Sequence, residues 1–132
     1  MHHLAIISSN KEAALLFYHE KLGFPIIRSN YREERGVWKI DLKINEETEL
    51  ELFIMKDSPK RLSHPEACGL RHLAFAVDSV ADSVAELEKK GISCEPIRTD
   101  TFTGKPMTFF RDPDDLPIEI HELKIRPSDL TI

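Results

Sequence analysis

The 132-residue sequence contains one pattern twice, and this repeat limits the fold more than any other feature of the chain. Each half opens on a short apolar run that begins with a histidine, His3 or His72. A helix-type pattern follows and ends at Gly23, 20 residues after His3, or at Gly91, 19 residues after His72. Repeats of this kind mark structural units that are built alike.

Hydrophobic periodicity predicts the same order of elements in both halves, strand, helix and then three strands. Each helix is expected to begin at a serine that can cap its first turn, Ser9 with Glu12 in a capping box and Ser79 with Asp82. The expected strands are 3–7, 24–31, 37–44 and 48–55 in the first half, and 72–77, 93–98, 107–111 and 116–122 in the second.

Strict alternation within two strands assigns side chains to faces. In 37–44 the apolar residues Trp38, Ile40, Leu42 and Ile44 share one face, and the charged residues Lys39, Asp41 and Lys43 lie on the other. In 48–55 one face carries Leu50, Leu52 and Ile54, and the other carries Glu49, Glu51, Phe53 and Met55.

Each half also ends on a strand glutamate at a matched distance from its histidine. Glu51 follows His3 by 48 residues, and Glu119 follows His72 by 47. If a helix covers one face of each sheet, the other face carries these residues. Two such faces related by a pseudo-twofold axis would line one cavity, where the four side chains converge.

Two carboxylates in one enclosed cavity repel each other and are costly to desolvate, so a divalent cation is expected between them. Imidazole and carboxylate ligands suit zinc, nickel, cobalt, manganese or iron. Four ligands without cysteine leave room for water, as a catalytic centre requires. His2 is out of phase with this face, and His19, His64 and His121 have no counterpart in the repeat. We interpret these four as surface residues.

Composition sets the class of protein. Apolar residues make up 41% of the chain, charged residues 31%, and the net charge is −5. The acidic balance argues against a nucleic-acid partner. No apolar run approaches the roughly 20 residues of a membrane span. Cys68 and Cys94 lack metal-binding spacing and are expected to be free thiols in a reducing cytoplasm.

These residues carry a resemblance to a known family. The motifs are His3 with the following Leu-Ala-Ile, Phe17-Tyr18 before Leu22-Gly23-Phe24, His72-Leu73-Ala74-Phe75, and Asp112-Pro113-Asp114 before Ile118-Glu119. Together they resemble the vicinal oxygen chelate superfamily, and within it the glyoxalase I-like proteins (lactoylglutathione lyase-like). Asp115 departs from the pattern, which usually has glycine there, and Asp tolerates the left-handed conformation better than most residues.

The resemblance implies an α+β fold of two βαβββ modules whose cupped mixed sheets surround a metal. The expected domain spans 1–123, with modules 1–55 and 71–123, a linker 56–70 and a tail 124–132. It implies that His3, Glu51, His72 and Glu119 hold one divalent ion. It also implies a homodimer, and the spacing is compatible with a site inside one chain or shared between two.

The activity implied is that of a metal-dependent lyase or isomerase acting on a small 2-oxoaldehyde–thiol adduct through an enediolate, with Glu119 as the base and Glu51 as its symmetric partner. An anionic adduct such as one with glutathione needs cations, which Arg28, Arg32, Arg35, Arg71, Arg98, Lys105 and Arg111 could supply. Three alternatives remain at this point: an acyl-thioester epimerase, an iron dioxygenase, and a small-molecule binding protein without catalysis.

Overall fold

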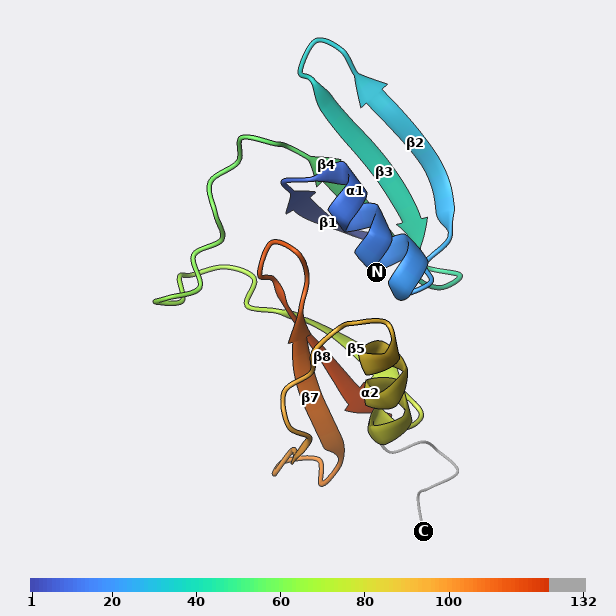
Figure 1. The fold of residues 1–132 in the computed structure, drawn as a ribbon, viewed down its shortest axis with the longest axis vertical. Coiled ribbons are helices and arrows are strands. Elements are labelled where there is room, and N and C mark those ends of the chain that lie inside the picture. Colours follow the sequence, from blue (N-terminus) through green and yellow to red (C-terminus); the bar gives the residue numbers. More distant parts are fainter. Residues whose placement is uncertain (124–132) are drawn as a thin grey trace. The chain divides into compact units, whose positions relative to one another are not determined.

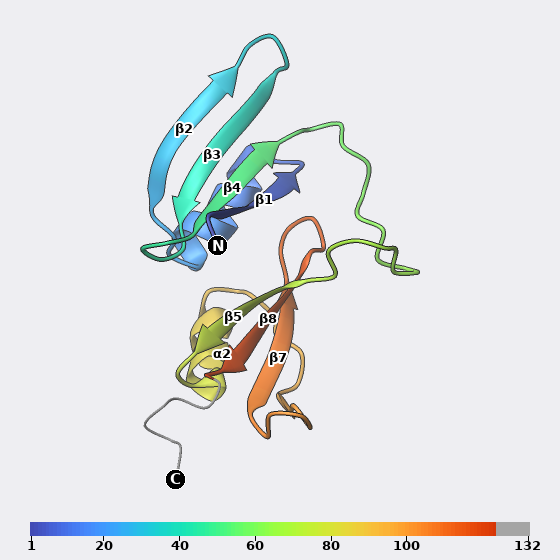
Figure 2. The ribbon, with the colours of Figure 1, turned by 180° about the vertical axis from the view of Figure 1, so that it is seen from behind.

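The protein is described here by a computed structural model covering residues 1–123, so the expected tail 124–132 lies outside the described residues. Contacts divide the chain into two compact units, with the boundary between Arg61 and Leu62 (Figures 1 and 2). Among residues 1–123, no helix has both the length and the apolar character needed to span a membrane.

The first unit is a four-stranded mixed sheet with a helical segment on one face (Figures 1 and 2). The elements are β1 (His3–Ser8), α1 (Lys11–Leu15), the π-helical η1 (Leu16–Lys21), β2 (Ile26–Arg32), β3 (Val37–Lys43) and β4 (Glu49–Ile54). The strand order is β1-β4-β3-β2, in which β1 and β4 are parallel and the other pairs antiparallel. Its core includes Phe17 and Tyr18 from η1 and the alternate residues Leu50, Leu52 and Ile54 of β4.

The second unit repeats this arrangement. It contains β5 (Leu73–Val77), α2 (Val80–Lys89), β6 (Arg98–Thr99), β7 (Pro106–Arg111) and β8 (Pro117–Glu122). The order β5-β8-β7-β6 again pairs the first and last strands in parallel. Buried Val80 and Leu87 of α2 and Ile118 and Ile120 of β8 belong to its core. The predicted order of elements and the α+β class with mixed sheets are therefore confirmed.

Several local predictions were confirmed and one cap was wrong. Ser79 caps α2 by accepting a hydrogen bond from the Asp82 N–H at 3.1 Å, as expected. The first helix is instead capped by Asn10, whose side chain accepts from the Ala13 N–H at 2.9 Å, and not by Ser9. Asn is at least as good an N-cap as Ser, so capping by Asn10 in place of Ser9 does not lower the stability of the helix.

Both predicted helix-ending glycines adopt the conformation that the prediction required. Gly23 and Gly91 each have φ of +82°, in the left-handed region where only glycine avoids a steric penalty.

The predicted strand 93–98 was mostly wrong, since only Arg98 and Thr99 are in a strand there. Pro96 has no N–H to give to a ladder. The segment is attached to β7 by other bonds: the Glu95 N–H donates to the Phe109 carbonyl at 2.9 Å, and the Thr108 hydroxyl donates to the Glu95 carbonyl at 2.7 Å.

Candidate metal centre

In the first unit, His3 and Glu51 lie together on the face of the sheet opposite the helical segment. Ala5 of β1 is the register partner of Glu51 on β4, and His3 is two residues before Ala5, so all three share a face. His3 Nδ1 lies 3.6 Å from Glu51 Oε2. The histidine side chain is 43% exposed and the glutamate side chain 12%, so the carboxylate is partly withdrawn from water while the ring is open to it.

In the second unit, His72 and Glu119 form the corresponding pair. His72 Nε2 lies 3.2 Å from Glu119 Oε1. The His72 ring meets the Phe109 ring edge to face, with 5.0 Å between centroids. His72 Nδ1 is buried and has no hydrogen-bond partner among residues 1–123, whereas Nε2 is the ring nitrogen that faces Glu119.

The two pairs occupy the same place in their sheets, residue by residue. Glu119 is the register partner of Ala74, and His72 is two residues before Ala74, as His3 is before Ala5. In both units the glutamate is on the last strand, which is parallel to the first. The predicted repeat therefore extends to the register of the candidate ligands.

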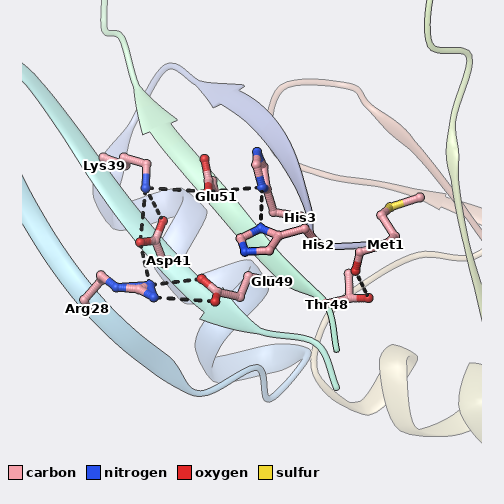
Figure 3. A network of polar contacts seen from close by, with 9 residues as sticks. All are labelled: Met1, His2, His3, Arg28, Lys39, Asp41, Thr48, Glu49 and Glu51. Carbon is pink, nitrogen blue, oxygen red and sulfur yellow. Dashed lines mark hydrogen bonds and ion pairs between the residues drawn. The ribbon is translucent and has the colours of Figure 1, made fainter. Parts of the chain in front are cut away.

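A polar network surrounds Glu51 that the sequence did not identify as part of the site (Figure 3). Lys39 Nζ lies 3.6 Å from Glu51 Oε2 and 3.0 Å from Asp41 Oδ1. Arg28 Nη1 lies 3.0 Å from Asp41 Oδ2 and 3.0 Å from Glu49 Oε1. Asp41 is only 1% exposed, although alternation gave it an outward face. A carboxylate buried this deeply needs charged partners, and the two cations provide them.

His2 is exposed, as predicted, but it also contacts one residue of this network. Its Nδ1 lies 2.8 Å from His3 Nδ1 (Figure 3). The signal available in the sequence was adjacency alone. Because one ring must donate and the other accept, this contact holds the His3 ring in a defined orientation.

A second unpredicted network holds the loop between β6 and β7 against β8. His121, expected at the surface, is 15% exposed; its Nε2 lies 3.2 Å from Asp100 Oδ2 and 3.1 Å from Thr103 Oγ1. The Glu122 backbone carbonyl, 2.6 Å from Nδ1, raises the pKa of His121, and Asp100 adds to the effect. The pKa of Asp100 is lowered, chiefly because the Phe102 N–H donates to its carboxylate and then because of His121.

The predicted site requires a His–Glu pair in each unit and the meeting of the two pairs. The structure forms the pair in each unit. Within residues 1–123, neither unit by itself gathers three or more His, Cys, Asp or Glu side chains that could hold a metal. Each unit brings together one histidine and one glutamate, and both their ligand role and the convergence of the two pairs stay predictions. Cys68 and Cys94 are free cysteines, as expected.

Two βαβββ units, each with a histidine and a glutamate on the open face of a mixed sheet, define the paired-module architecture of the vicinal oxygen chelate proteins. A model of the Glyoxalase/Bleomycin resistance protein/Dioxygenase superfamily matches residues 1–120. The chain belongs to this superfamily. It is 55% identical to the uncharacterized protein YwkD of Bacillus subtilis over 122 residues, which cover 92% of this chain and 95% of YwkD.

Solved structures with this fold have several roles. A glyoxalase family protein from Enterococcus faecalis is 53% identical, with a TM-score of 0.88 over 92% of this chain and 96% of its own. The trypanothione-dependent glyoxalase I of Leishmania major is 26% identical, with a TM-score of 0.71 over 92% and 85%. TnmS3, an antibiotic-binding protein from Streptomyces, is 20% identical, with a TM-score of 0.70 over 92% and 93%, a likeness that extends to the fold alone.

Proposed function

We propose that the His–Glu pairs of the two units together hold one divalent metal ion, and that the protein is a metal-dependent lyase or isomerase of glyoxalase I type. The observation that carries the proposal is the shared register: His3 and Glu51 occupy the same sheet positions as His72 and Glu119. A structural role alone gives no reason for two sheets to place the same two residue types at equivalent points of their open faces.

The chemistry of these donors fits such an ion. Two neutral imidazoles and two carboxylates give a site whose charge a divalent cation cancels, and zinc, nickel, cobalt, manganese and iron all accept this set. Glu51 and Glu119, with side chains 12% and 13% exposed, are partly desolvated and gain from a cation. The buried Nδ1 of His72 leaves Nε2 directed to Glu119 and to a ligand.

When bound, the metal would stabilise the negative charge that develops on adjacent oxygens of the substrate. Glu119 would take a proton from the carbon next to the substrate carbonyl and return it to the neighbouring carbon. Glu51 is the symmetry-related candidate for the same transfer. His3 and His72 would hold the site together, the first oriented by His2 and the second by Phe109. The reaction class is therefore proton transfer between two carbons of an oxygenated substrate.

The test uses purified, metal-stripped protein, to which zinc, nickel, cobalt or manganese is added back, and the methylglyoxal–glutathione adduct as substrate. We expect turnover with at least one metal and a decrease of about 10²–10⁴-fold for Glu119→Gln, the range for loss of a general base. Glu49→Gln is the matched control, because Glu49 lies on the face of Glu51 but contacts Arg28. It should keep activity within about threefold, as it loses no proposed ligand or base.

Turnover by none of the four metal forms would reject the lyase assignment, whatever the protein binds. An acyl thioester is tested as the alternative substrate. Exchange of its α-proton for solvent deuterium, without turnover of the methylglyoxal–glutathione adduct, would assign an acyl-thioester epimerase instead, because both reactions begin with the same proton abstraction.

The proposal includes a homodimer, tested by sedimentation velocity, and a mixing experiment then locates the site. His3→Ala and His72→Ala chains are mixed and allowed to exchange. If the site forms between chains, one of the two sites in each mixed dimer is intact, which is about a quarter of all sites after random exchange. If it forms within one chain, none return.

A further inference from the structure

The ammonium group of Lys39 lies between two carboxylates, and one of them is a proposed metal ligand. Lys39 Nζ is 3.0 and 3.2 Å from the two oxygens of Asp41 and 3.6 Å from Glu51 Oε2 (Figure 3). The same Glu51 oxygen is 3.6 Å from His3 Nδ1. His3 Nδ1 and Lys39 Nζ therefore both approach one oxygen of the carboxylate that the proposed metal would bind.

Asp41 determines where this ammonium group is. It is the register partner of Glu51 on the neighbouring strand, and its carboxylate is 1% exposed. Both of its oxygens contact Lys39, whereas Glu51 offers one oxygen at a longer distance. Arg28 holds the carboxylate from the other side at 3.0 Å. The closer, two-oxygen contact keeps Lys39 mainly on Asp41.

We infer that Lys39 and Asp41 set the metal affinity of the site: Lys39 weakens binding by sharing Glu51, and Asp41 limits this effect by drawing the ammonium group away. The inference rests on the proposed metal site. Its physical reason is that a carboxylate oxygen cannot give its full charge to two cations at once. Lys39 is 21% exposed and Glu51 12%, so water and salt screen the contact only in part.

Lys39→Met tests the first half of the inference. An opposite charge within about 4–6 Å changes the proton affinity of a carboxylate by about 1–3 powers of ten, and a divalent cation competes for the same oxygen. Because Lys39 is shared with Asp41, we expect the low end of this range, which is Zn²⁺ binding about tenfold tighter than in the wild type. The matched control is Lys43→Met, which removes a charge from the same strand face, where Lys43 Nζ lies 2.8 Å from Glu46.

Asp41→Asn tests the second half. The amide keeps the shape of the side chain, but Lys39 loses its charged partner and moves toward Glu51, so Zn²⁺ binding should weaken about tenfold. Glu49→Gln removes one charge from the same face, where Glu49 contacts Arg28 and not Lys39, and should have a smaller effect. In a Lys39→Met background, Asp41→Asn should weaken binding no more than Glu49→Gln does, because the group that Asp41 restrains is gone.

The measured quantity is the Kd for Zn²⁺, from competition with a chromophoric chelator, so no catalytic activity is needed. Tighter binding in Lys39→Met than in Lys43→Met, with weaker binding in Asp41→Asn, supports the inference. Equal Kd values for Lys39→Met and Lys43→Met overturn it, as does an Asp41→Asn effect that persists without Lys39. If the wild-type protein binds no Zn²⁺, the proposed metal site is overturned together with this inference. If the wild type binds Zn²⁺ and His3→Ala does not, the proposed site is supported even where the Lys39 and Asp41 results overturn the inference.

Discussion

The turn that leads into β8 depends on one buried carboxylate, and its removal should destabilise the protein. Asp112 is 5% exposed. Its Oδ1 accepts hydrogen bonds from the backbone N–H groups of Asp114 and Leu116, each at 2.9 Å. Its own N–H donates to the Leu116 carbonyl at 3.0 Å, which closes the turn three residues before Glu119. Asp112→Ala leaves two N–H donors without their acceptor.

The expected loss follows from these two bonds. A hydrogen bond to a charged group contributes about 1.5–3 kcal/mol, so the pair is worth about 3–6 kcal/mol. Removal of the buried carboxylate also relieves its desolvation cost, which offsets part of the loss. We expect the free energy of unfolding of Asp112→Ala to fall by about 3 kcal/mol, which lowers the melting temperature by about 10 °C in a chain of this size.

Urea denaturation followed by circular dichroism measures this change, and Asp115→Gly is the matched control in the same turn. Asp115 has φ of +70°, a region that costs most residues about 1–2 kcal/mol and glycine nothing. Glycine adds about 0.5–1 kcal/mol of chain entropy and removes an exposed pair with Arg111 that is worth less than about 1 kcal/mol. Asp115→Gly should therefore stay within about 1 kcal/mol of the wild type. A smaller loss for Asp112→Ala than for Asp115→Gly would refute the reasoning.

Three further outcomes are expected. Leu52→Ala, at a fully buried position of β4, should cost about 3 kcal/mol in urea denaturation, whereas exposed Leu62→Ala should change stability by less than about 0.5 kcal/mol. Cys68 is exposed and should react with Ellman's reagent well before Cys94, whose pKa burial raises; equal rates would contradict this. His121→Ala should speed amide exchange in the loop between β6 and β7, because its contacts to that loop are lost, and an unchanged exchange rate would show that other bonds hold the loop.

The repeat made most of the fold predictable. Two matched sets of periodic segments and two glycines at helix ends were enough for the order of elements, since each signal is local and each half supports the other. The failures were also local in origin. Asn10 and Ser9 are neighbours that can both cap a helix, and a pattern of apolar residues does not rank them. Pro96 removed the ladder bond that the predicted strand needed.

For the site, alternation assigned side chains to faces but not to depths. His3, Glu51, His72 and Glu119 lie on the expected faces because a period of two fixes direction along a strand. The burial of Asp41 depends on a partner from another strand: the register of β2 shifts between Ile26 and Arg28, which places Arg28 opposite Asp41. Such an irregularity comes from tertiary pairing, and nothing in the alternation of β3 indicated it.

Metal stoichiometry in single variants tests the central claim most directly, that one His–Glu pair from each unit completes a single centre. The number of Zn²⁺ ions bound per chain is measured by equilibrium dialysis and elemental analysis for the wild type, His3→Ala and His72→Ala. The account predicts one tightly bound ion per wild-type chain and none in either variant. Two ions in the wild type with one left in each variant would contradict it, since each pair would then bind a metal independently.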